Sequence, residues 1–288
     1  MRDRLAIIVG VALFIRVATG AETTNGPVYQ GRPLTDWLQD FSNPGLMVEA
    51  PRPGVMEKSQ QARVAILEMG TNVIPALLNI LHNKTSPESG LWFDEPRMSA
   101  GQAIALFGGQ AKFALPDLVE LLRTETNISY PEAVALGAIG PDAIPPLCPM
   151  LTNSAQLPHR GAAAAFAHIC GRYFGQPVLS NAMSALTYAL RHEPDMEVRT
   201  EIAQTMSLVR ISNAIPAMLE SLSDPNLEVR EAIINALAYY DYDEKTVIAA
   251  LEKVRDNDPD PTMKIIAARA IADFQERLKW KPTNAPAR

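Results

Sequence analysis

The sequence predicts an all-α protein, a right-handed α-solenoid of about six helix pairs with capping helices at both ends. Three observations lead to this expectation. Apolar residues make up 47% of the 288 residues and aromatic residues only 6%, a composition that favours closely packed helices over a β-sandwich. Amphipathic segments recur in pairs along the chain. In most pairs the second segment begins with a proline.

The first twenty residues have the three-part layout of a secretory signal peptide. Two arginines precede an apolar stretch, Leu5–Ile15, and the small residues Ala18 and Gly20 suit cleavage after Gly20. The stretch is too short, at about 1.5 Å per helical residue, to cross a hydrocarbon core of about 30 Å. We therefore expect residues 1–20 to be removed and the protein to be periplasmic or extracellular, with no stable membrane span. The alternative is an uncleaved anchor whose span continues past Arg16.

Residues 21–58 are predicted to form an N-terminal linker and a capping helix. A short helix is expected from about Thr35, and it contains Trp37, Leu38 and Phe41. A solenoid must cover the apolar face of its first repeat, so we expect these three side chains to cap the array.

The array itself is expected over residues 59–278, and proline marks its units. In four units a proline follows Ile or Leu and is followed, two and six positions later, by apolar residues on the same helical face. Proline is tolerated in the first helical turn because its missing N–H has no intrahelical partner there. The four prolines are Pro75, Pro116, Pro145 and Pro216, and two weaker units share the register at Ser184 and Ile248.

A second amphipathic segment precedes each of these positions, so each unit is predicted to be a helix, a tight turn and a helix. Gly70 and Gly140, each five residues before a proline, stand where a helix ends in a left-handed conformation. The second helices are expected on the concave side, where their acidic residues favour a neutral or basic partner. Met263–Leu278 is expected to cover the far end, and 279–288 to form a loose tail.

The segments between repeats resemble a known family. A Val-Arg pair follows an acidic-Pro turn in EPDMEVRTEIAQTM, from Glu193, and in DPNLEVREAIINAL, from Asp224; a Met-Lys pair replaces it in DPDPTMKIIAARAI, from Asp258. The pattern resembles the short bacterial HEAT repeats, the type also found in phycobilisome lyase-like proteins, and it extends over residues 59–278. The resemblance implies a helical-repeat fold in an exported protein and says little about function.

Arg199 and Arg230 are the arginines of these Val-Arg pairs, and we expect both to be structural. A guanidinium group can reach back to carboxylates and carbonyls of the preceding turn and so tie neighbouring repeats together. The alternative is a role in ligand binding.

The sequence contains no GxSxG, P-loop or dinucleotide-binding motif, so a protein without enzymatic activity or cofactor is predicted. Its histidines and cysteines lack zinc-site spacing, and no metal is expected. HEAT-repeat di-iron hydroxylases use several His-Glu pairs, whereas His192-Glu193 occurs once here and is interpreted as coincidental. Cys148 and Cys170 are expected as two buried thiols, with one disulfide as the alternative.

The charge of the protein argues against nucleic acid as a partner. The formal net charge is −6, and it becomes −8 when residues 1–20, which hold three Arg and one Asp, are removed. An acidic surface repels phosphate backbones. A nucleic-acid enzyme with this kind of fold would need a basic groove and a cytosolic location.

Three departures from the regular repeat are candidate partner-binding loops, because insertions in solenoids often lie at binding faces. They are residues 83–95, residues 171–177 and the tyrosine-rich turn after Leu237. Exposed aromatic side chains there would form hot spots for an unknown protein partner; those of the first loop would otherwise fold back onto the next helix pair. The candidate residues are Trp92, Phe93, Tyr173, Phe174, Tyr239, Tyr240 and Tyr242.

The sequence therefore predicts a non-enzymatic protein-protein interaction or scaffold module that acts outside the cytoplasm through a curved helical-repeat surface. The alternative, implied by the likeness to lyase-type HEAT proteins, is an accessory subunit of an enzyme or a small-ligand binder. A deep apolar pocket with convergent polar groups would favour the alternative, and a smooth concave face would favour the interaction module.

Overall fold

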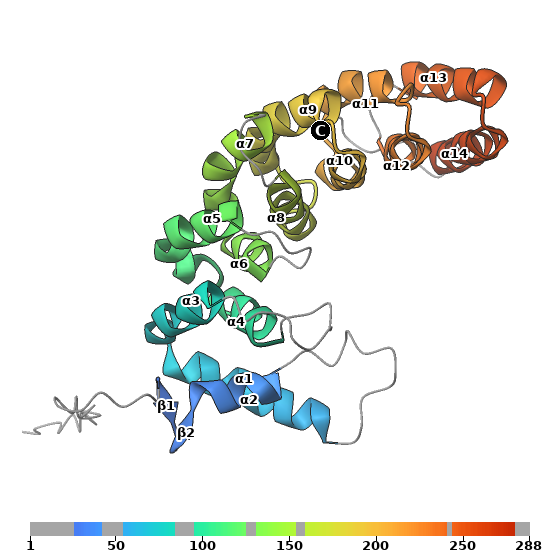
Figure 1. Ribbon diagram of the computed structural model, residues 1–288. Helices are drawn as coiled ribbons and strands as arrows, with labels where there is room; N and C mark the ends of the chain where they lie inside the picture. Colours follow the sequence, from blue (N-terminus) through green and yellow to red (C-terminus); the bar gives the residue numbers. More distant parts are fainter. Residues whose placement is uncertain are drawn as a thin grey trace, which may run out of the picture.

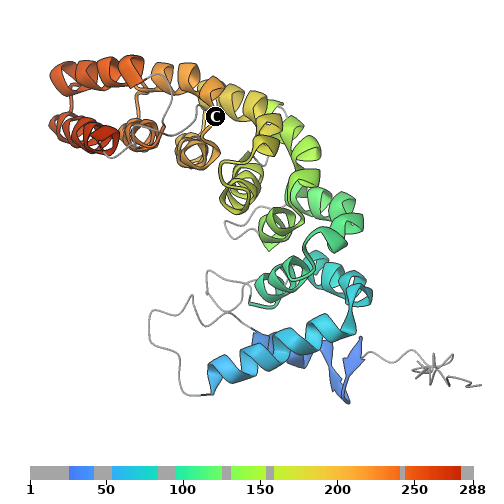
Figure 2. The same ribbon diagram turned by 180° about the vertical axis from the view of Figure 1, so that it is seen from behind.

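The computed structural model shows a curved α-solenoid in which two rows of helices follow one arc (Figures 1 and 2). The fold class predicted from the sequence is confirmed. The predicted signal segment and most of the predicted tail lie outside the residues that the structure describes. These residues are 26–41, 54–83, 95–124, 131–153, 159–240 and 244–279.

Within the described residues, six helix pairs form the array, in the register that the prolines predict. A 3-10 segment lies between the two helices of each of the first five pairs. The pairs are α2 (Val55–Met69) with α3 (Ile74–His82), α4 (Glu95–Ala105) with α5 (Leu115–Thr124), α6 (Pro131–Ile139) with α7 (Ile144–Thr152), α8 (His159–Arg172) with α9 (Met183–His192), α10 (Met196–Val209) with α11 (Ile215–Ser221), and α12 (Leu227–Ala238) with α13 (Glu244–Asn257).

A small cap covers the first pair. It consists of an antiparallel hairpin, β1 (Val28–Tyr29) and β2 (Arg32–Pro33), followed by α1 (Leu34–Phe41), which packs on α2 and α4. Leu38 is buried there, whereas Trp37 is half-buried and donates from Nε1 to the carbonyl of Tyr29 at 3.4 Å. The sequence predicts the helix but not the hairpin.

The last helix, α14 (Pro261–Lys279), closes the other end by packing against α12 and α13. Its apolar face is buried at Met263, Ala267 and Phe274. The opposite face carries exposed polar and charged residues together with Ile265, Ala268 and Ala272, which are also exposed. The terminal helix therefore covers the core of the last pair.

The ends of the paired helices follow from proline and glycine chemistry. Pro75, Pro145 and Pro216 stand in the first turn of α3, α7 and α11, where the fixed φ of proline suits the helix. Gly70 and Gly140 end α2 and α6 with φ of 70° and 90°, but with ψ of −173° and −142°. These angles are extended at positive φ, a region essentially restricted to glycine, rather than the left-handed helical conformation that the sequence predicts.

The first helices of the pairs form the inner, concave row of the arc, and the second helices form the outer, convex row (Figure 1). The expectation that the second helices line the concave side is wrong. The inner helices carry small residues and approach closely: a Cβ atom added to Gly137 of α6 would lie 2.3 Å from the Cβ atom of His168 in α8. A Cβ atom added to Gly101 of α4 would lie 2.3 Å from the carbonyl oxygen of Pro131. Because the inner row is the more closely spaced, the array bends towards it.

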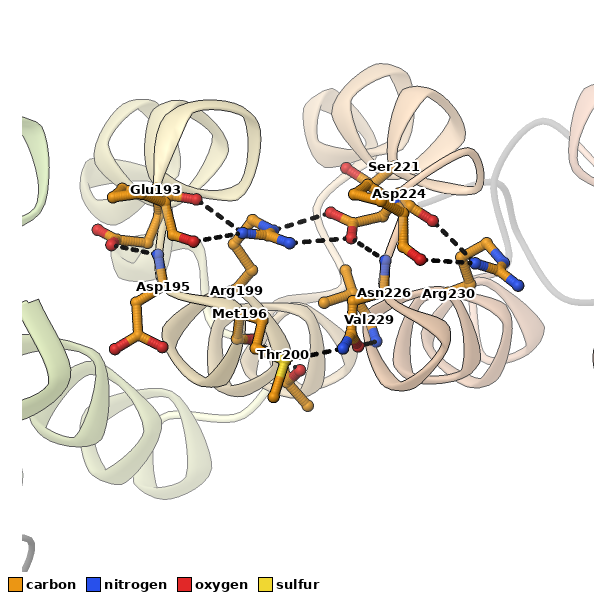
Figure 3. Close-up of polar contacts among 12 residues, drawn as sticks. Glu193, Asp195, Met196, Arg199, Thr200, Ser221, Asp224, Asn226, Val229 and Arg230 are labelled. Atoms are coloured by element: carbon orange, nitrogen blue, oxygen red, sulfur yellow. Dashed lines mark hydrogen bonds and ion pairs between the residues drawn. The ribbon is translucent and has the colours of Figure 1, made fainter.

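Arg199 joins two consecutive repeats near the start of α10 (Figure 3). Its guanidinium donates to both carboxylate oxygens of Asp224, at 2.8 and 3.0 Å, and to the backbone carbonyls of Glu193 and Pro194. The two carbonyls belong to the preceding turn, as the sequence predicts. The carboxylate belongs to the following turn, so the arginine reaches forward as well as back.

Other arginines make the same contact between consecutive inner helices, and we call the set the arginine ladder. Arg230 also donates to the carbonyls of the turn before it, and Arg97 donates to the carbonyl of Leu81. At the end of the array Lys264 replaces the arginine and donates to the carbonyl of Asp256. The rungs of the ladder are Arg97–Glu132 at 2.7 Å, Arg160–Asp195 at 2.8 Å, Arg199–Asp224 at 2.8 Å and Arg230–Asp258 at 3.1 Å.

The acidic residues of the ladder also shape the turns in which they lie. Asp224 accepts a hydrogen bond from the backbone N–H of Asn226 at 2.8 Å, and Asp258 accepts one from that of Asp260 at 2.9 Å. The side chains of Arg199 and Asp224 are only 12% and 8% exposed. Each partner therefore depends on the other to compensate a charge that is largely removed from water.

We expect Arg199→Met to lower the free energy of unfolding by about 2–4 kcal/mol, because the substitution leaves the Asp224 carboxylate buried without its cation. Urea denaturation followed by circular dichroism measures the loss. In Arg199→Met/Asp224→Asn the second change should recover part of it, as a double-mutant cycle would show.

The matched control is Arg191→Met, which breaks a bidentate contact to Glu220 between exposed side chains. Solvent screens this pair, so the loss should be clearly smaller. Equal losses in the two single variants would contradict the structural role of the ladder.

Candidate functional site

The concave face of α10, α12 and α14 is hollowed into two adjoining grooves, which we together call the concave trough. One groove, of 370 Å³, lies between α10 and α12, and the other, of 580 Å³, lies between α12 and α14. Glu231, Asn235 and Tyr239 of the α12 segment line both. The other lining residues include Thr200, Gln204 and Ser207 from α10 and Ile266, Arg269, Asp273, Glu276 and Arg277 from α14.

The spacing of residues on α12 explains why the trough is polar while the core beneath it is apolar. Val229, Ile233 and Leu237 are fully buried and lie four residues apart on one helical face. Glu231 and Asn235, also four apart, occupy the opposite face and line the trough. Glu231 and Asn235 can therefore contact a partner without disturbing the core.

The trough offers mixed hydrogen-bonding groups rather than a concentrated charge. Amide side chains at Gln204 and Asn235 can both donate and accept. Glu231 and Asp273 supply negative charge, and Arg269 supplies positive charge. The second helices, whose acidic residues were expected on the concave side, lie on the convex side instead.

Tyr240 is a core residue, so its prediction as a partner-binding residue is wrong. Its side chain is fully buried, and its hydroxyl donates to the carbonyl of Met206 at 2.9 Å. Burial raises the pKa of the Tyr240 phenol. The prediction is wrong because the tyrosine-rich turn begins directly after α12, where Tyr240 still packs inside the array.

The other aromatic candidates have different environments. Tyr173 is half-buried, and its ring covers Gly140, where a Cβ atom would lie 2.4 Å from the tyrosine oxygen. The ring of Tyr173 thus occupies the space that a side chain at position 140 would need. Phe174 and Tyr239 remain 47% and 51% exposed. Trp92, Phe93 and Tyr242 lie outside the described residues.

Phe174 and Tyr239, from two separate candidate loops, both lie near the guanidinium of Arg210. The guanidinium carbon of Arg210 lies 4.8 Å from the ring centre of Phe174 and 5.8 Å from that of Tyr239. A second guanidinium, that of Arg277, lies 5.7 Å from the same Tyr239 ring. We call Phe174, Arg210 and Tyr239 the Arg210 clasp. It places a cation and two exposed aromatic rings at one edge of the concave trough.

Arg210 is held at an energetic cost. It ends α10 in the left-handed conformation, with φ 49° and ψ 40°, which costs a residue other than glycine about 1–2 kcal/mol. Its Nε atom is shielded from solvent and has no hydrogen-bond partner. Cation-π contacts with the two rings offset part of this cost. Arg210 was not predicted as a site residue; the available signal was an arginine at the end of α10, the place at which α2 and α6 end in glycine.

The histidines and carboxylates of the described residues form no group that could hold a metal ion. His192 is exposed against the ring of Tyr188, whereas Glu193 is buried and pairs with Nδ1 of His159. The two residues of the His192-Glu193 pair therefore have separate partners.

Both cysteines are free thiols, so the alternative of a disulfide is not realised. Cys170 is fully buried, and burial raises its pKa to about 12. Cys148 is only partly buried, and its Sγ lies 3.9 Å from the carbonyl of Asn181. The expectation of a buried thiol therefore holds fully for Cys170 alone.

Two rows of short helices, joined by a repeated arginine contact, define the class of the protein as an α-solenoid. Residues 183–272, from α9 into α14, match the family model for HEAT repeats, and they include the rungs at Arg199 and Arg230. A comparison with curated proteins finds no match. Within the described residues, no single helix is long and apolar enough to cross a membrane.

Solved structures with a similar arrangement include three helical proteins. An engineered protein is 22% identical with a TM-score of 0.44, and the match covers 84% of this chain and 63% of that one, less than two thirds of its length. A designed armadillo repeat protein in complex with the peptide (KR)4 is 17% identical with a TM-score of 0.38, covering 84% and 99%. Human deoxyhypusine hydroxylase in complex with glycerol is 15% identical with a TM-score of 0.38, covering 84% and 96%.

The buried thiol gives a pH-dependent prediction. In the folded chain Cys170 stays protonated up to a pKa of about 12, whereas an unfolded thiol ionises near pH 8.5, about its ordinary pKa. This contribution to stability is complete below pH 8.5 and declines as the pH rises, with a loss of about 2 kcal/mol at pH 10.

Urea denaturation of the wild type and of Cys170→Ala across this pH range measures the difference, because the two chains share every other titrating group. We also expect Ellman's reagent to leave Cys170 unmodified in the native protein at pH 8. Equal pH dependence in the two chains, or rapid native modification of Cys170, would contradict the prediction.

Proposed function

We propose that the protein is a non-enzymatic interaction module that binds an extended segment of a partner protein along its concave trough. The observation that supports this most is that two grooves adjoin over three consecutive inner helices and share Glu231, Asn235 and Tyr239. An elongated trough of this kind suits an extended polypeptide chain better than a compact molecule.

The chemistry of the trough suits a polypeptide backbone. An extended segment presents N–H and C=O groups at intervals of about 3.3 Å along its length. Gln204 and Asn235, on neighbouring helices, carry amides that can pair with both kinds of group. Tyr239 adds apolar surface with a polar end, a combination common in protein interfaces.

The alternative, a small-ligand binder or accessory subunit, receives less support. Pockets for small ligands bury most of the ligand surface within largely apolar walls. The two grooves are open to solvent, and charged residues line them.

Site-specific photocrosslinking tests the proposal. A benzoylphenylalanine at position 204 or 235 should give discrete adducts with a partner protein, because both positions line the trough. The matched control is the same residue at Ala249, an exposed position on the convex helix α13. Adducts formed equally from position 249, or from that position alone, would contradict binding in the trough.

We also propose that the protein acts outside the cytoplasm after removal of residues 1–20. The support is the short apolar stretch after two arginines and the small residues at Ala18 and Gly20. N-terminal sequencing of the exported protein should begin at Ala21, and Ala18→Phe/Gly20→Phe should retain the full-length chain. A full-length wild-type chain in the cytosol, or in the membrane fraction, would contradict cleavage.

A further inference from the structure

We propose that the Arg210 clasp binds the carboxylate of an acidic side chain in the partner segment, an inference that rests on the proposed function. The three residues of the clasp come from three consecutive inner helices. Phe174 follows α8, Arg210 ends α10 and Tyr239 ends α12. Tyr239 also lines both grooves of the trough, so the clasp continues that surface.

The geometry of the clasp leaves the guanidinium suited to a planar anion. Two aromatic rings have their centres 4.8 and 5.8 Å from the central carbon of the Arg210 guanidinium. The N–H groups of a guanidinium lie in its plane and point outwards from its edge, where they match the two oxygens of a carboxylate. Arg210 is half-buried and its Nε is shielded, so a carboxylate would approach the two terminal nitrogens, Nη1 and Nη2, while the rings keep their contacts with the cation.

Arg210 differs from the ladder arginines because, among the described residues, no carboxylate pairs with it. Arg199 and Arg230 each hold a carboxylate through two hydrogen bonds. Within the described part of the chain, no carboxylate or carbonyl accepts a hydrogen bond from the Arg210 side chain, and its Nε atom is shielded from water. An anion supplied by a partner would neutralise a cation that has no carboxylate partner among the described residues.

The backbone at Arg210 supports a role beyond ending the helix. A helix that ends in the left-handed conformation is best served by glycine, yet α10 carries arginine at φ 49°. An observed backbone outlier at a surface site is grounds for a functional hypothesis. Here the guanidinium is the feature that glycine would lack.

Neighbouring charges define the rest of the partner's chemistry. Arg277 lies 5.7 Å from the Tyr239 ring and adds positive charge beside the clasp. Further along the trough Glu231, Asp273 and Glu276 bring negative charge, of which Arg269, 3.8 Å from Asp273, offsets a part. The complementary segment therefore carries one acidic residue at the clasp and neutral or basic residues along α12 and α14.

Arg210→Gly is the informative variant, because it removes the guanidinium and keeps the backbone conformation. Two pools of short synthetic peptides serve as probes, identical except that Asn and Gln replace Asp and Glu in the second pool. Wild-type protein should prefer the acidic pool by about tenfold in affinity, and Arg210→Gly should lower this preference to less than about twofold. The matched control, Arg191→Gln, should retain it, because Arg191 pairs with Glu220 away from the trough.

A second measurement separates the site from the proposed function. In ¹H–¹⁵N spectra the Nε–H signal of Arg210, identified by its absence in Arg210→Gly, should shift saturably with acetate and not with acetamide. No acetate-dependent shift, or an acid preference that persists in Arg210→Gly, overturns the carboxylate site. An acetate shift without binding of either peptide pool contradicts the polypeptide partner and leaves a carboxylate site alone.

Stability distinguishes a binding role from a structural one. If Arg210 serves the ligand, Arg210→Gly should melt at the same temperature as the wild type or higher, since glycine relieves the backbone cost. If Arg210 serves to hold Phe174 and Tyr239 in place, the variant should melt at a lower temperature, and the proposal falls. Arg210→Lys, which keeps the charge but not the fork of donors, should retain only part of the acid preference.

Discussion

The contact between an arginine at the start of one inner helix and an aspartate in the turn before the next sets the geometry of the solenoid. In the rung formed by Arg199 and Asp224, one guanidinium holds two carbonyls of its own turn and two oxygens of the following turn. Asp224 also fixes the turn in which it lies, through the N–H of Asn226. A single ion pair thus links the shape of a turn to the spacing between repeats, and that spacing determines where the concave trough can form.

The N-terminal half of the arc reaches close spacing by a second means. The Arg97–Glu132 rung is present, with the carboxylate fully buried in α6. Here the helices also touch through glycine: Gly101 lies under the carbonyl of Pro131, and Gly137 lies under His168. Backbones that meet at glycine approach more closely than side chains allow. The inner row is therefore closely spaced for two reasons: ion pairs recur along its length, and contacts at glycine add to them towards the N-terminus.

Most of the fold could be predicted because its signals are local. Proline in the first turn and glycine at the end of a helix act within a few residues of the chain. The helix ends predicted from Pro75, Pro216 and Gly70 are therefore correct. Which helices of the pairs form the inner row depends on the volumes of many side chains together. No single sequence motif indicates the answer. For the same reason Tyr240 looked like a loop residue, although it is buried against a carbonyl thirty-four residues earlier in the chain.

The clasp could not be predicted from the sequence for a related reason. Phe174 and Tyr239 stood out as aromatic residues in irregular segments, but Arg210, which lies between them, is ordinary in sequence. What distinguishes it is the conflict between a large charged side chain and a backbone conformation that favours glycine. Among the described residues only Gln30, in the turn of the β1–β2 hairpin, shares this positive φ without being glycine. Arg210 lies on the surface beside a groove, and a conflict between side chain and backbone at such a place is expected where a residue serves a role other than the stability of the isolated chain.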